Sequence, residues 1–137
     1  MNPDNNLDFK CTCGLAMPFK DCCGKYIYGT AIPVTPEQLM RSRYSAYVHN
    51  VPVYLMATHH PDFIADLNET LNEETAANTD WLRLEVVFSQ GDDSSDEGIV
   101  EFKAWFQNGE QEACLHERSR FVFEDQQWFY TNGEINP

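Results

Sequence analysis

Residues 82–88 read Leu82-Arg83-Leu84-Glu85-Val86-Val87-Phe88, and this run decides the fold. Apolar residues occupy every second position, and more polar residues stand between most of them. Because successive side chains of a strand point to opposite faces, this spacing predicts a half-buried strand. Its apolar face is expected to consist of Leu82, Leu84, Val86 and Phe88.

Three further strands are expected downstream of this run. They span residues 99–107, 113–124 and 127–131. Asn108-Gly109 is a strong signal for a tight hairpin turn, and Asn132-Gly133 predicts the end of the last strand. Short connections between neighbouring strands predict an antiparallel meander.

The chain before residue 80 has the features of helices instead. Thr35 can cap a helix, Pro36 suits its first position, and Gln38 can complete a capping box. A second short helix is expected over residues 54–59, and one or two helices fit residues 62–78. Helices followed by a meander predict an α+β fold in which helices pack on an antiparallel sheet.

Composition limits the classes of function. The 137 residues fit one domain of ordinary size, and 42% apolar residues allow a packed core. With 9 basic and 22 acidic residues, the net charge of −13 argues against a nucleic acid or an anionic membrane as partner. No run approaches the ~18 apolar residues of a bilayer span. Residues 1–6 lack the basic and apolar regions of a signal peptide, so a cytoplasmic location is expected.

The charge is distributed unevenly along the chain. Acidic and basic residues balance within residues 1–31, so the excess negative charge lies beyond them. Four of the five cysteines also fall in that first stretch, and residues 29–33 have the composition of a connector. We therefore expect an N-terminal segment over residues 1–31 and a main domain over residues 32–137.

The N-terminal cysteines follow the pattern C-x-C-x8-C-C and are Cys11, Cys13, Cys22 and Cys23. Cytosolic thiols are normally reduced, and four thiolates are a common ligand set for tetrahedral zinc. Such a site leaves no open coordination position, which favours structural over catalytic zinc. Chance clustering or a redox pair, such as a bond between the vicinal Cys22 and Cys23, is the alternative. Cys114 is expected to be a small core or surface residue.

The cysteine segment resembles the SEC-C zinc motif through Cys11-Thr12-Cys13-Gly14 and Cys22-Cys23-Gly24. That motif is best known from the tail of the preprotein-translocase ATPase, where it contacts an export chaperone. The resemblance therefore implies a zinc ion and a protein partner. Thr12 replaces the usual proline and Leu15-Ala16 the usual Ser-Gly, which should not affect ligation.

The rest of the chain is similar to the YchJ-like bacterial family. The most specific run is Thr35-Pro36-Glu37-Gln38-Leu39-Met40-Arg41-Ser42-Arg43-Tyr44-Ser45-Ala46-Tyr47. Further matches are Tyr54-Leu55, Thr58, His60-Pro61, Trp81-Leu82, Val100-Glu101-Phe102, Glu117-Arg118-Ser119-Arg120-Phe121 and Trp128-Phe129-Tyr130. This resemblance implies a nuclear-transport-factor-2-like domain, a cone of helices packed into a curved sheet, and it brings no activity with it. Some relatives repeat the cysteine motif at the C-terminus, and this chain has no second copy.

A cavity under the sheet is a second candidate site. On the third expected strand, Glu117 and Ser119 share a face with the apolar Leu115, Phe121 and Phe123. A carboxylate on a concave face needs a partner. The candidate partners are Arg41, Arg43, His59 and His60. The residues proposed for a ligand pocket are therefore Arg41, Arg43, His60, Glu117 and Ser119. A buried Glu–Arg pair that fastens a helix to the sheet explains the same residues.

Two functions remain open. In the first, the chain is a non-catalytic adaptor that docks a protein partner through its zinc motif. In the second, the cavity binds a small molecule or catalyses a reaction, and zinc only stabilises the N-terminus. The absence of a nucleophile–base pair, a phosphate loop or a cofactor motif favours the adaptor.

Overall fold

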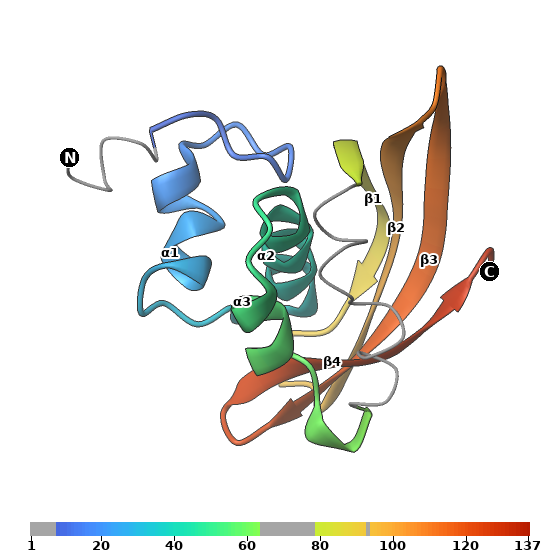
Figure 1. Ribbon diagram of the computed structural model, residues 1–137. Coiled ribbons are helices and arrows are strands. Elements are labelled where there is room, and N and C mark those ends of the chain that lie inside the picture. The colour runs from blue at the N-terminus through green and yellow to red at the C-terminus, as the bar shows by residue number, and fades with distance from the viewer. Residues whose placement is uncertain (1–7, 64–78, 93) are drawn as a thin grey trace.

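The computed structural model describes residues 8–63, 79–92 and 94–137 (Figure 1). Its sheet has four antiparallel strands in the order β1-β2-β3-β4. The strands are β1 (Asp80–Gln90), β2 (Glu97–Asn108), β3 (Gln111–Glu124) and β4 (Gln127–Ile135). The predicted meander is confirmed, and the Asn108-Gly109 turn joins β2 to β3 with Gly109 at a φ of +65°.

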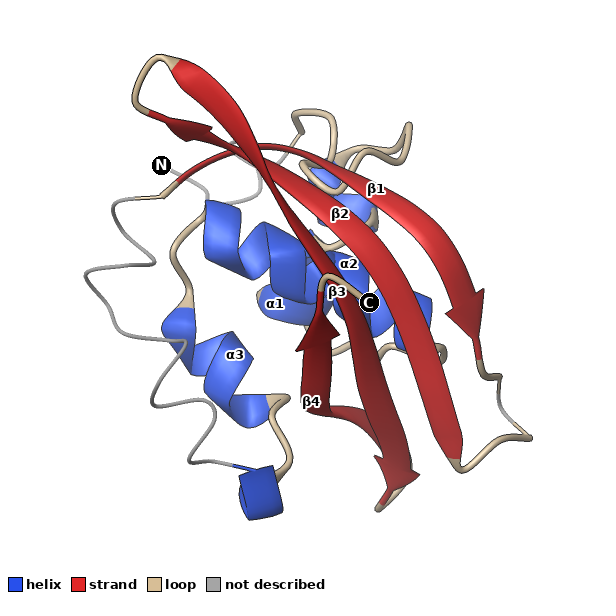
Figure 2. Ribbon diagram, turned by 90° about the vertical axis from the view of Figure 1, so that its right-hand side faces the viewer, coloured by secondary structure: helices blue, strands red, loops and turns tan. Residues whose placement is uncertain are grey.

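The helices lie on one side of this curved sheet (Figure 2). They are α2 (Pro36–Val48) and α3 (Pro52–Ala57), followed by the short 3-10 turn η3 (Pro61–Phe63). The α+β prediction is therefore confirmed. The second helix begins at Pro52 rather than at residue 54, since proline suits a first helical position. Most of the helical stretch expected over residues 62–78 lies outside the described residues.

The N-terminal segment forms a third layer, on the opposite side of α2 from the sheet (Figure 1). It contains the 3-10 turn η2 (Phe19–Asp21) and the single-turn helix α1 (Gly24–Ile27). Helix α2 is thus the middle layer and contacts both the cysteine segment and the sheet.

Helix α2 begins as its sequence predicts. The Thr35 hydroxyl accepts a hydrogen bond from the backbone N–H of Gln38 at 3.1 Å. The Gln38 side chain in turn accepts from the N–H of Val34 at 2.8 Å, one residue earlier than in a standard capping box. The inner face of the helix places Leu39, Met40 and Tyr44 in the main core with residues of the sheet.

Strand β1 departs from the simple alternation expected of it. The pairing with β2 shifts between Trp81 and Arg83 and again between Val86 and Phe88. Leu84 and Val86 pack against the core as expected, whereas Leu82 is 43% exposed and Phe88 is 45% exposed. The expectation that all four apolar residues share the buried face is wrong, because each bulge reverses which face the next side chain occupies.

Strand β4 continues beyond the stop expected at Asn132-Gly133. Gly133 pairs with Ser119, and the strand ends only at Ile135. A β-carbon at Gly133 would overlap the Glu117 carboxylate. The glycine allows two strands to approach a large side chain and does not act as a breaker here.

Candidate functional site

The four N-terminal cysteines converge in the structure. Their sulfur atoms all lie within 4.8 Å of one another, and all four residues are buried. They are Cys11, Cys13, Cys22 and Cys23. The first pair flanks a turn in which Gly14 N–H donates to the Cys11 carbonyl at 3.3 Å. The second pair lies between η2 and the start of α1. Two short local structures therefore bring the two cysteine pairs to one point.

The donor set fits a divalent metal ion. Cys13 Sγ and Cys22 Sγ lie 3.7 Å apart, close to the ~3.8 Å that tetrahedral zinc–thiolate bonds require. Burial, together with the neighbouring Cys13, raises the pKa of the Cys22 thiol to about 12. Hydrogen bonds from Cys13 and Cys23 lower the pKa of Cys11. A bound cation would displace the thiol protons and hold all four sulfur atoms as thiolates. All five cysteines are free thiols.

Polar side chains of α2 support the first cysteine turn. Arg41 Nη1 donates to the Cys13 carbonyl at 2.9 Å, and its Nε pairs with Glu37 at the same distance. The Thr12 hydroxyl lies 2.8 Å from Ser45 Oγ and 3.2 Å from His49 Nε2. The proline that usually occupies this position in the motif has no hydroxyl, so it could not make these two contacts. Sequence reasoning missed Ser45 and His49, because no local pattern links α2 to the cysteines.

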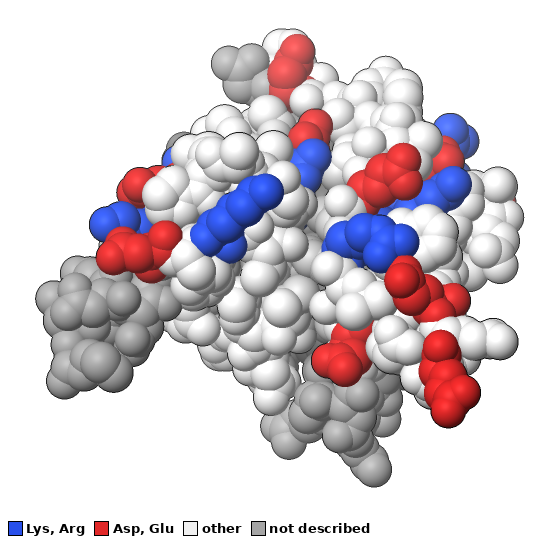
Figure 3. Space-filling view, turned by 90° about the horizontal axis from the view of Figure 1, so that it is seen from above, with Lys and Arg blue, Asp and Glu red and all other residues white. Residues whose placement is uncertain are grey.

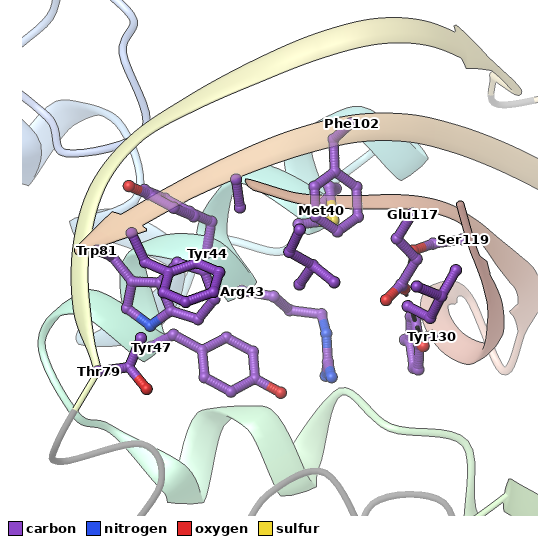
Figure 4. Close-up of a pocket in the computed structure, with 14 residues that line it drawn as sticks. Met40, Arg43, Tyr44, Tyr47, Thr79, Trp81, Phe102, Glu117, Ser119 and Tyr130 are labelled. Carbon is purple, nitrogen blue, oxygen red and sulfur yellow. Dashed lines mark hydrogen bonds between the residues drawn. The ribbon is translucent and has the colours of Figure 1, made fainter. Parts of the chain in front are cut away.

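A cavity of about 420 Å³ lies between α2 and the sheet (Figure 4). Helix α2 contributes Met40, Arg43, Tyr44 and Tyr47, which are spaced to share one helical face. The sheet contributes a mostly apolar wall. Its lining residues are Trp81, Phe102, Ala104, Phe106, Leu115, Glu117, Ser119, Tyr130 and Ile135, with Thr79 just before β1. The cavity is therefore apolar over most of its surface.

The polar end of the cavity is built around Glu117. Its Oε2 accepts hydrogen bonds from Ser119 Oγ at 2.5 Å and from the Tyr130 hydroxyl at 3.1 Å. Burial, with the negative charge of Glu117, raises the pKa of Tyr130, so this phenol stays protonated and donates. The guanidinium of Arg43 lies over the Tyr130 ring, 4.7 Å from its centre. Figure 4 shows Arg43, Tyr130 and Glu117 close together at this end.

The expected ion pair between Glu117 and an arginine or histidine is wrong. Within the described residues, no such pair forms. Arg43 Nη1 instead donates to the Leu55 carbonyl at 2.9 Å and to Thr58 Oγ1 at 2.7 Å. Hydroxyl groups near Glu117 supply its hydrogen bonds. Sequence reasoning missed Tyr130 as a hydrogen-bond donor to Glu117. The short turn after Glu124 pairs Tyr130 with Phe121, which lies on the same face of the sheet as Glu117.

The structure brings together Arg43, Glu117 and Ser119 but separates Arg41 and His60 from them. Residues 41 and 43 are about 200° apart around a helix, so Arg41 faces the cysteine segment when Arg43 faces the cavity. His60 lies outside the cavity, where its Nε2 is 2.9 Å from Glu124 Oε2. The pocket expected around all five residues is corrected to the three that line the cavity.

The face of the molecule that is seen from above in Figure 3 carries both signs of charge. On the face seen in Figure 3, the Lys and Arg side chains of the described residues are scattered among Asp and Glu side chains, with broad uncharged areas between them. The exclusion of nucleic acid stays a prediction from net charge. None of the helices in the described part of the chain has the length and apolar character needed to cross a bilayer.

The curved sheet, its covering helices and the four-cysteine cluster define a class of α+β proteins with a candidate metal centre. Comparison with known proteins gives the family. Residues 35–133 match the family model described as the YchJ middle NTF2-like domain. The chain belongs to this YchJ-like family, which confirms the resemblance noted in its sequence and the NTF2-like fold.

Individual relatives agree with this assignment. A UPF0225 protein of Serratia proteamaculans is 45% identical over 126 residues, which cover 90% of this chain and 81% of that protein. The solution structure of a SEC-C motif containing protein from Rhodopseudomonas palustris matches with a TM-score of 0.79 and 31% identity, covering 94% of this chain and 100% of that one. The crystal structure of a SEC-C motif containing protein from Psychrobacter arcticus matches with a TM-score of 0.76 and 29% identity. The match covers 96% of this chain and 86% of that one.

Proposed function

We propose that the protein is a zinc-binding, non-catalytic adaptor whose cysteine segment docks a protein partner. The observation that carries this proposal is the concentration of exposed apolar side chains on that segment. A third of the large apolar side chains exposed in the described residues lie between residues 9 and 28. They are Phe9, Leu15, Met17 and Tyr28.

Zinc is the metal that best suits the cysteine cluster. Four thiolates at tetrahedral separations match its preference for soft ligands and four-coordination. The ion would be held by Cys11, Cys13, Cys22 and Cys23, and it would fix the turns that precede α1. Thiolate ligation requires reduced thiols, which supports a cytoplasmic location. The two structural relatives are described as SEC-C motif containing proteins, which supports a metal-binding role for this segment.

Metal analysis of the purified chain tests the zinc assignment. We expect about one equivalent of zinc per chain. Cys22→Ser should lower the zinc content sharply, since one ligand is lost. Cys114→Ser is the matched control, because Cys114 is exposed and lies outside the cluster. Equal zinc content in the two variants, or iron in place of zinc, would contradict the assignment.

The docking surface follows from the same segment. Leu15 and Met17 are exposed apolar side chains two residues apart in one turn, and neighbouring exposed apolar side chains are typical of protein interaction sites. Leu15 and Met17 lie in the loop between the two cysteine pairs, and the metal would hold this loop in place. The partner is therefore expected to present an apolar groove or helix face to the loop.

Affinity capture from a bacterial lysate can test the docking surface with matched variants. We expect a defined protein to be retained by the wild type and lost with the double variant Leu15→Ser, Met17→Ser. The control is Val53→Ser, Met56→Ser, which removes two even more exposed apolar side chains from α3. Zinc content should be unchanged in both variants. Capture of the same proteins by wild type and both variants would contradict the adaptor role.

A further inference from the structure

The cavity beneath the sheet has the features of a ligand-binding site, and this reading does not depend on the adaptor proposal. Its wall is apolar, and its polar end joins one carboxylate and one guanidinium through a tyrosine. We propose that it binds a compact, uncharged ring compound that bears a hydroxyl group.

The size and lining of the cavity define the body of this ligand. A volume of about 420 Å³ is within the usual range of small-molecule sites. Trp81, Phe102 and Phe106 provide flat aromatic surface from neighbouring strands. Rings pack against such surfaces in offset or edge-to-face geometry. An occupant of a few fused rings therefore matches both the volume and the polarity of the cavity.

Glu117 supplies an acceptor for the ligand. Its Oε2 already receives the Ser119 and Tyr130 hydroxyls, whereas no hydrogen bond within the described residues reaches Oε1. The carboxylate lines the cavity, so Oε1 is available to a donor on the occupant. A hydroxyl group is such a donor.

Arg43 determines the charge of the ligand. Its side chain is only 4% exposed and lines the same cavity as Glu117, beside the Tyr47 hydroxyl. A carboxylate ligand would meet Glu117, and an ammonium ligand would meet Arg43. A neutral hydroxyl can donate to Glu117 and accept from Arg43 or Tyr47, so it satisfies both signs of charge at once.

The arrangement differs from a purely structural clamp. A clamp between helix and sheet would bring guanidinium and carboxylate into direct contact. Here the Tyr130 ring is stacked under Arg43 and its hydroxyl points to Glu117. The two charges therefore remain next to the cavity without forming an ion pair with each other.

Titration of the full chain with three matched probes tests this inference. The probes are naphthalene, β-naphthol and β-naphthoate, which share a ring system and differ in the polar group. Binding is followed by amide NMR shifts, with zinc left in place. We expect β-naphthol to shift the resonances of Glu117, Ser119 and Tyr130 and to bind about tenfold more tightly than the other two, as one hydrogen bond to a charged group allows.

Variants of two glutamates on the same strand provide the control. Glu117→Gln keeps the side-chain volume but removes the charge, and should weaken β-naphthol about tenfold while leaving naphthalene unchanged. Glu112→Gln, which lies on β3 outside the cavity, should leave both unchanged. Equal affinity for all three probes, tightest binding of β-naphthoate, no binding of β-naphthol, or no effect of Glu117→Gln would each overturn the proposal.

Discussion

At the residue scale, Glu117 lies where β3, β4 and the cavity meet. Its carboxylate accepts hydrogen bonds from Ser119 and Tyr130, and its side chain lies over Gly133 of the neighbouring strand. Gly133 has no β-carbon, so β4 can pass beside this side chain. The position of the carboxylate therefore depends on a glycine that is sixteen residues away in the chain but adjacent in the sheet.

Replacing Gly133 tests this contact. Gly133→Ala should cost about 1–3 kcal/mol in the free energy of unfolding, because the new methyl group overlaps the Glu117 side chain. In a Glu117→Ala background the same substitution should cost less than ~0.5 kcal/mol, since the obstructing atoms are gone. Urea denaturation of the four proteins in this cycle measures the coupling. If the two substitutions changed the free energy of unfolding additively, overlap with Glu117 would not be the reason that position 133 requires glycine.

Removing the Glu117 side chain alone tests whether Glu117 and Arg43 form an ion pair. Glu117→Ala leaves two hydroxyls without their acceptor and should cost about 1–2 kcal/mol. A direct Glu–Arg clamp would predict a loss of about 3–5 kcal/mol, because a buried cation would lose its partner. Arg43 keeps its contacts to Leu55 and Thr58 in the variant. Denaturant unfolding distinguishes the two values, and a loss in the higher range would contradict the geometry described here.

At the scale of elements, α2 could be predicted better than the strands it covers. Its cap residue follows from local chemistry, because Thr35 and Gln38 act within one turn. The bulges in β1 depend on pairing with β2, which no local pattern encodes, so Leu82 and Phe88 were placed on the wrong face. Helical geometry shows that Arg41 and Arg43 face opposite sides, but not which side meets the cavity. The cysteine cluster was predictable because four ligands of one type occur close together in sequence.

The α2 cap gives a prediction for that helix. Thr35→Ala should lower the free energy of unfolding by about 1 kcal/mol, because the Gln38 N–H loses its acceptor. Thr35→Ser should retain most of the stability, since it keeps the hydroxyl. Thr30→Ala serves as a control at an exposed position before the helix. Equal stability of Thr35→Ala and the wild type in thermal and urea unfolding would show that the cap contributes nothing.

The pairing of β2 with β3 predicts a pH effect. His116 Nε2 lies 2.8 Å from Glu101 Oε2, and this hydrogen bond lowers the pKa of Glu101. A lowered pKa in the folded state contributes stability above the ordinary glutamate range, and this contribution is lost as the pH falls through the folded value. The pKa of the Glu101 carboxyl should therefore fall below the ordinary glutamate range in an NMR titration, and lie closer to that range in His116→Ala. A midpoint at or above the ordinary value in the wild type would contradict the pair.

At the scale of the whole molecule, α2 connects two sites of different character. One side faces the cavity through Arg43 and Tyr47, and the other holds the cysteine segment through Arg41 and Ser45. The main domain has its own core of α2 and sheet residues, whereas the cysteine segment buries few apolar side chains besides Phe19. Metal ligation is therefore expected to supply most of the folding energy of residues 8–31.

The most direct test of this account is a comparison of amide NMR spectra before and after chelation at neutral pH. We predict that removing the metal collapses the resonances of residues 8–31 toward random-coil positions, while residues 35–63, 79–92 and 94–132 keep their dispersed signals. Restoring zinc should restore the original spectrum. Spectra that do not change on chelation, or the cooperative loss of every dispersed signal, would contradict a metal centre that fastens one segment to an independently folded domain.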